Sequence, residues 1–252
     1  MKLKFSIEPQ LQILEQAVSL LQKTLDAAIQ TAQSPKDLNA RQVFIYRHAR
    51  NIRDLAKDVS ALGNVGSLGS IYLLTRPALE SLFKLAAAIN EENFALEKLV
   101  AEMADERGRL EKWSAAGEPL WEAVLKKIIL ELKEGETELR QLYEVRGELR
   151  WKQTSEVAKA AKLQVELVRD YFVGSKHVHA TVSALVDREA GCLYVIEALH
   201  RLIATVCRAA ELTNEFFCVT PFTFEDASKV ETQSENFFGQ VEKQLKEHIS
   251  VQ

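Results

Sequence analysis

Apolar residues recur every three or four positions along nearly all of this chain of 252 residues. The first such stripe consists of Leu11, Leu14, Val18, Leu21, Leu25, Ala28 and Ala32. This spacing places the apolar side chains on one face of an α-helix, and no strand-type alternation extends over more than a few residues. We therefore predict an all-α fold, a multi-helix bundle built on long antiparallel helices.

Two predicted helices dominate this bundle. Residues 67–89 are apolar nearly all round, which is typical of a central helix, and Pro77 should kink or break it. Residues 188–218 carry a second long apolar seam, which ends shortly before Pro221. The charge-rich segment Glu91–Lys112 is interpreted as a solvated outer helix.

The chain shows no internal repeat and no linker between regions of different composition. We expect one helical-bundle domain over residues 1–224. Residues 225–252 are expected to form an amphipathic C-terminal tail, docked on the bundle or partly mobile. The apolar stripe of this tail consists of Phe237, Phe238, Val241 and Leu245.

Charge and cysteine content limit the compartment and the partners. Lysine and arginine number 32 against 36 acidic residues, so the net charge of −4 argues against a dedicated nucleic-acid binder. The three cysteines lack metal-type spacing and fit a reducing cytosol. No signal peptide is recognised, and the charges within 67–89 argue against a membrane span. We expect a cytoplasmic protein without a metal or cofactor.

The first polar constellation lies within the central helix. Arg76, Glu80 and Lys84 are the only charged residues between Gly66 and Ile89, and their i, i+4, i+8 spacing puts them on one stripe. This stripe is either a solvated edge of the helix or the wall of an interior cleft. In a cleft, each charge would need a partner to offset its desolvation, and arginine would present its fork to a carboxylate or phosphate.

The second constellation is a histidine-containing segment. Tyr171, Ser175, His177 and His179 follow one another closely, and Arg169 lies just before them. These residues are either packing and capping groups at a helix junction or a site. The candidate catalytic residues are His177, His179 and Arg169, because a histidine changes charge near neutral pH.

We expect the two constellations to meet across helices, because so apolar a central helix needs neighbours for its polar stripe. The candidate ligand-binding residues are Arg76, Glu80, Tyr171, Ser175 and His177.

Two stretches resemble the uncharacterised bacterial family called domain of unknown function 5677. The first is LLTRPALES at 73–81, and the second is Trp151 followed by SEVAKAA at 155–161, leading into Tyr171 and the serine and histidines after it. Residues 152–154 depart from the pattern, which has a small residue there. The resemblance implies an all-helical protein without an assigned activity.

Three functions stay open. The leading one is a binding or regulatory module with a polar pocket between helices. The second is a metal-independent ribonuclease, because HEPN-type nucleases carry an arginine and a histidine with four to six residues between them. Arg41 and His48 have six residues between them, whereas Arg169 and His177 have seven. The third is a scaffold that self-associates through its long helices. RNA is a partner only if the chain is such a ribonuclease. The residues alone do not decide whether the chain is an enzyme.

Overall fold

The computed structural model describes residues 6–32, 38–64, 68–115, 122–142, 144, 149, 152–166, 171 and 188–250. Within these residues there are nine helices and no strand, and 88% of this part is helical. The prediction of an all-α helical bundle is confirmed. Among the same residues, no helix combines the length and the hydrophobicity needed to cross a membrane.

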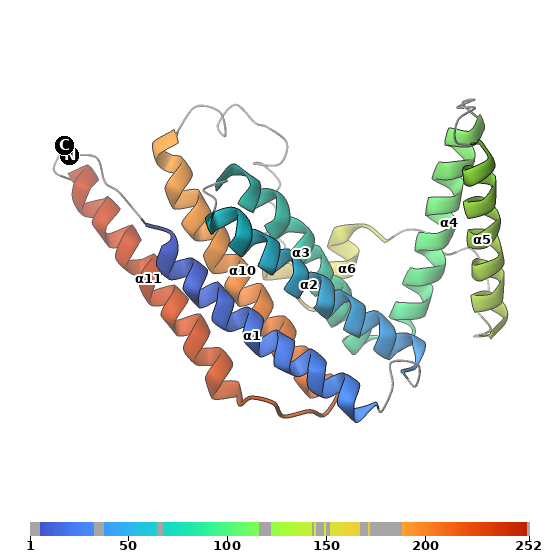
Figure 1. The fold of residues 1–252 in the computed structure, drawn as a ribbon, viewed down its shortest axis with the longest axis horizontal. Helices are drawn as coiled ribbons and strands as arrows, with labels where there is room; N and C mark the ends of the chain where they lie inside the picture. Colours follow the sequence, from blue (N-terminus) through green and yellow to red (C-terminus); the bar gives the residue numbers. More distant parts are fainter. Residues whose placement is uncertain are drawn as a thin grey trace.

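Five long helices form the main bundle (Figure 1). They are α1 (Glu8–Thr31), α2 (Ala40–Asn64), α3 (Leu68–Asn90), α10 (Arg188–Phe216) and α11 (Phe224–Ser250). Helices α2 and α3 pack closely, α10 packs against α1 and α3, and α11 lies along α1 and α10. The stripe predicted along α1 faces inward, because burying an aliphatic side chain contributes about 1.5–3 kcal/mol. The fully buried core side chains include Leu14, Leu21, Leu25, Ile45, Ile52, Phe83, Leu85 and Leu199.

Helix α3 is the central helix that its composition predicts. It contacts α2, α10, α4 and α6, and the buried residues of its second half are Ala78, Leu79, Ser81, Leu82, Phe83, Leu85, Ala86, Ala87 and Ala88. The helix continues through Pro77 without ending. It runs over 68–90 against the predicted 67–89, and α10 runs over 188–216 against the predicted 188–218.

Helices α4 (Phe94–Ala115) and α5 (Glu122–Leu142) form a hairpin that projects from the bundle (Figure 1). The two helices approach closely at Gly135, where a Cβ atom would lie 2.6 Å from Met103 Cε. The hairpin is attached to the bundle through the first turns of α4, where Phe94, Ala95 and Lys98 are buried. Only the first turns of α4 are buried against the bundle. The rest of the helix is charged and partly exposed to solvent, as the sequence predicts.

A short helix, α6 (Thr154–Ala160), packs against α3, and α7 (Gln164–Glu166) follows it. Glu156 caps α6 by accepting a hydrogen bond from the Gln153 backbone at 2.8 Å. At its other end, the Asn90 side chain donates to the carbonyls of Ala160 and Ala161 at 3.2 and 3.0 Å. These bonds hold α6 beside the end of α3, opposite the start of α4.

Helix α11, which covers most of the predicted tail, is anchored by a buried polar network. Gln10 and Ser234 are both fully buried, and Gln10 Nε2 donates to the Ser234 carbonyl at 3.2 Å while Ser234 Oγ donates to Gln10 Oε1 at 3.0 Å. His200 on α10 adds a 2.8 Å bond to Ser234 Oγ and stacks on Phe238. Because a buried polar group is costly without partners, this network fixes how α11 lies on α1 and α10.

The end of α3 is held by Arg41, which gives a testable stability effect. Its Nε and Nη2 donate to the carbonyls of Ala88 and Ile89 at 2.7 and 2.8 Å, two groups that a helix end leaves without intrahelical partners. We expect Arg41→Lys to lower the free energy of unfolding by about 1–3 kcal/mol, because lysine lacks the two-pronged geometry. Urea denaturation measures this change. The control is Arg50→Lys on the exposed face of α2, and an equal loss in both variants would contradict the role of Arg41.

Candidate functional site

The structure brings three of the predicted ligand-binding residues together. Arg76 Nε lies 3.0 Å from Glu80 Oε1, and Arg76 Nη2 donates to the Tyr171 hydroxyl at 2.7 Å. The Tyr171 hydroxyl in turn donates to Glu80 Oε1 at 3.0 Å, and the Arg76 guanidinium lies 4.8 Å from the centre of the tyrosine ring. The three side chains therefore form a closed triangle on one edge of α3.

The other predicted site residues lie outside the described part of the chain. These are Arg169, Ser175, His177 and His179. The expected approach of Arg76 to His177 therefore stays a prediction. The Arg76 and Glu80 side chains are 25% and 34% exposed, so their edge of α3 is half-buried rather than fully solvated.

Lys84, the third residue of the polar stripe on α3, pairs with a residue of α4. Lys84 Nζ lies 2.8 Å from Glu102 Oε1, and Lys98 Nζ lies 3.7 Å from the same oxygen. Lys98 is only 3% exposed, which is unusual for a lysine. One carboxylate thus sits between two ammonium groups at the junction of α3 and α4.

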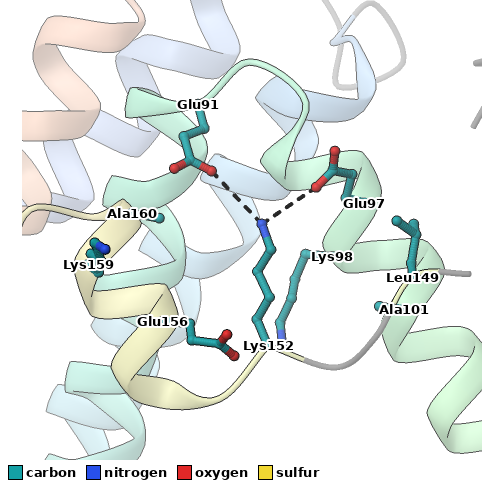
Figure 2. Close-up of a pocket in the computed structure, with 9 residues that line it drawn as sticks. All are labelled: Glu91, Glu97, Lys98, Ala101, Leu149, Lys152, Glu156, Lys159 and Ala160. Atoms are coloured by element: carbon teal, nitrogen blue, oxygen red, sulfur yellow. Dashed lines mark hydrogen bonds and ion pairs between the residues drawn. The ribbon is translucent and has the colours of Figure 1, made fainter.

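A third lysine completes what we call the lysine cluster, Lys84, Lys98 and Lys152. Lys152, just before α6, has its Nζ 3.5 Å from Glu97 Oε2, 3.9 Å from Glu91 Oε2 and 5.0 Å from the centre of the Phe94 ring. Figure 2 shows Lys152 extending toward the two glutamates, with Lys98 next to it between α4 and α6. The cluster therefore joins residues from three separate parts of the chain.

Burial and charge both act on Lys98. Desolvation lowers the pKa of its ammonium, and the positive charges of Lys84 and Lys152 lower it further, while Glu102 acts in the opposite direction. Desolvation and like charges both disfavour the protonated form of an amine. Any negative charge added beside Lys98 would therefore stabilise its protonated form.

Two cavities meet at Lys98 and Lys152. The larger, of about 540 Å³, lies between α4 and α6 (Figure 2). Its lining residues are Glu91, Glu97, Lys98, Ala101, Leu149, Lys152, Glu156, Lys159 and Ala160. The smaller, of about 60 Å³, reaches α3 and is lined by Glu80, Phe83, Lys84, Lys98, Lys152, Thr154 and Val157. Among these described residues, the larger cavity balances three lysines with three glutamates, whereas the smaller one has three lysines and a single glutamate.

His48 lies on the α2 side of the same junction. It lines a cavity of about 230 Å³ together with Glu102, and its ring meets the edge of Phe44 with the ring centres 4.4 Å apart. Burial, together with the positive charges of Lys84 and Lys98, lowers the pKa of His48 to about 3. His48 is therefore neutral at physiological pH.

Arg41 and His48, the arginine–histidine pair with nuclease-like spacing, make structural contacts in this protein. The Arg41 guanidinium is occupied by the carbonyls at the end of α3 and lies over the Phe216 ring. A histidine with a pKa of about 3 is a weak general base at neutral pH. The geometry of Arg41 and His48 thus does not favour catalysis by this pair.

Lys98, Glu102 and Lys152 are not among the site residues predicted from the sequence. The available signal was the register of Lys98, which lies four residues after the buried Phe94 and three before the buried Ala101. That is a core position occupied by a lysine, although the surrounding charges make the segment look like a solvated helix.

Comparisons with known proteins add no relatives. No family model, curated protein or solved structure matches the chain. The resemblance to domain of unknown function 5677 therefore stays a prediction. Within the described residues, no group of three or more histidine, cysteine or acidic side chains is arranged to hold a metal ion.

The triangle at Arg76 predicts a specific loss in Tyr171→Phe. The variant keeps the aromatic ring over the guanidinium but removes both hydrogen bonds of the hydroxyl, so we expect a loss of about 1–2 kcal/mol in urea denaturation. Tyr46→Phe on α2 is the control, because that hydroxyl makes no hydrogen bond within the described part of the chain. If both variants were equally stable, the triangle would contribute nothing to the fold.

The low pKa of His48 predicts sensitivity to acid. The folded chain has a pKa of about 3 at this position against 6.5 ordinarily, so between these values the unfolded chain binds a proton that the folded chain does not. The free energy of unfolding must therefore fall as the pH falls through this window. Between about pH 7 and about pH 4, wild type should lose roughly 3 kcal/mol more than His48→Gln, as measured by urea denaturation. Parallel pH curves for the two proteins would contradict this expectation.

Proposed function

We propose that the protein is a binding module for a small anionic molecule, held beside Lys98 and Lys152 in the cavity between α4 and α6. The observation that carries the proposal is Lys98, a lysine that is 3% exposed and lines both cavities. Burying a charged lysine costs free energy that nearby negative charge offsets, and Glu102 Oε1 lies 3.7 Å from Lys98 Nζ. A bound carboxylate or phosphate would add further negative charge beside Lys98.

The size of the cavity supports a small molecule as the ligand. About 540 Å³ falls within the range of roughly 300–1,000 Å³ found for small-molecule sites. The apolar part of the wall is contributed by Ala101, Leu149 and Ala160, which can exclude water around the charged group. Weakening solvent screening in this way strengthens each contact between the ligand and a lysine.

The glutamates around the cavity favour selectivity over indiscriminate anion binding. Glu91 Oε2 and Glu97 Oε2 lie 3.9 and 3.5 Å from Lys152 Nζ. An incoming anion must therefore compete with these two carboxylates for the ammonium group of Lys152. The negative charge of Glu91 and Glu97 also repels ligands whose anionic group is not directed at Lys98. Repulsion by charged groups at the edge of a site is a common means of discriminating between ligands of similar affinity.

Anion binding should depend on Lys98. We expect phosphate or succinate to raise the melting temperature of wild type, because a ligand at about 100 times its Kd stabilises the folded state by about 2.7 kcal/mol. Lys98→Met should lose this shift and still fold, since methionine fills the buried space and Lys84 still pairs with Glu102 at 2.8 Å. The measurement is thermal unfolding across a ligand series, with calorimetric titration for the Kd.

The matched control is Lys127→Met, which removes a lysine whose side chain is 77% exposed on α5. This variant should bind as wild type does. Equal binding by Lys98→Met and Lys127→Met would place the ligand elsewhere, and the absence of any shift in wild type with either anion would refute the proposal.

A further inference from the structure

We propose that Lys98 captures its ligand covalently, by forming an imine with the carbonyl carbon of an anionic aldehyde or ketone bound between α4 and α6. The inference rests on the proposed anion site and adds a reaction and a ligand class to it. The class is a carbonyl compound that carries a carboxylate or phosphate close to the reacting carbon.

The position of the amine carries this inference. Lys98 lines both cavities, whereas Lys126 and Lys127 on α5 have side chains that are 68% and 77% exposed. Lys98 is buried in the first turns of α4, where this helix meets the bundle, so little of its side chain can sample solvent. A buried amine beside a cavity lies close to a bound ligand, and this proximity favours attack on a carbonyl group of that ligand.

The surroundings make this amine more reactive than a solvated one. The groups that face it are His48 from α2, Lys84 from α3, Glu102 from its own helix and Lys152 from the segment before α6. Desolvation and the two lysines lower its pKa, and His48 is neutral, so it adds no opposing charge. A lysine that is desolvated or placed beside other cations holds more of the neutral, nucleophilic form.

The reaction balances without an oxidant or a metal. The lone pair of neutral Nζ attacks the carbonyl carbon, a C–N bond forms, and the C=O π electrons move to oxygen, which takes up a proton. The nitrogen then loses a proton, and loss of the hydroxyl as water leaves the C=N bond. Glu102, 3.7 Å from Nζ, is placed to accept the proton from nitrogen and to return one to the departing hydroxyl.

The other two lysines of the larger cavity define the ligand. Lys152 and Lys159 line the cavity between α4 and α6 with Lys98, so they can pair with an anionic group while its neighbouring carbonyl faces Nζ. A 2-oxo acid and a phosphorylated aldehyde share this chemistry. A neutral carbonyl compound lacks the group that these two lysines would bind.

The test is reductive trapping of the full chain. We would incubate it at about neutral pH with pyruvate, pyridoxal 5′-phosphate or acetaldehyde, reduce with borohydride, and locate the adducts by peptide mass spectrometry. With the two anionic compounds, the ratio of adduct on Lys98 to adduct on Lys127 should be several times the ratio that acetaldehyde gives, because only the anionic compounds are held at the site. Equal ratios for all three compounds would show that the anionic group contributes nothing, and the relative yields with pyruvate and pyridoxal 5′-phosphate distinguish a carboxylate from a phosphate ligand.

Two measurements on wild type separate covalent capture from anion binding: calorimetric titration with phosphate or succinate, and mass spectrometry of the adduct on Lys98. Lys98→Arg cannot form a stable imine, so we expect it to lose the adduct. Adducts that follow solvent exposure, with Lys98 unmodified while anions still bind, would overturn covalent capture and leave the anion site intact. Phosphate should suppress labelling of Lys98 in wild type, and labelling that phosphate does not affect would contradict a shared site.

Discussion

The burial of α3 on most of its sides is the constraint on which the rest of the structure depends. Because α2, α10, α4 and α6 all pack against this helix, its three charged residues cannot remain in open solvent. Each is therefore met by a group from another turn or another element: Glu80 and Tyr171 meet Arg76, and Glu102 meets Lys84. The polar stripe thus positions the start of α4 against the bundle as well as completing α3.

One carboxylate lies between two ammonium groups at this junction, and burial acts together with their charges on both sides. Toward α2, burial and then the positive charges of Lys84 and Lys98 lower the pKa of His48. Toward α6, burial and then the charges of Lys84 and Lys152 lower the pKa of Lys98, against the effect of Glu102. Burial of charged groups at one junction therefore contributes both to the acid sensitivity expected at His48 and to the anion site proposed beside Lys152.

The helices and their order could be predicted from sequence because apolar periodicity is a local property. The stripe beginning at Leu11 and the composition of 67–89 sufficed to identify an inward face and a central helix. The lysine cluster could not be predicted in this way. Positions 84, 98 and 152 are brought together only when α4 and α6 pack on α3, and nothing local distinguishes Lys98 from the charged residues around it except its core register.

This arrangement also couples the proposed site to the attachment of the α4–α5 hairpin. Helix α5 packs against α4, and α4 reaches the bundle through its first turns, where Lys98 is buried. An anion held between Lys98 and Lys152 would tie α4 and the segment before α6 together at that point. A ligand stabilises whichever arrangement binds it more tightly, so occupancy would favour the position of α4 against the bundle. The proposed site is thus located where a bound anion would influence how the hairpin is held.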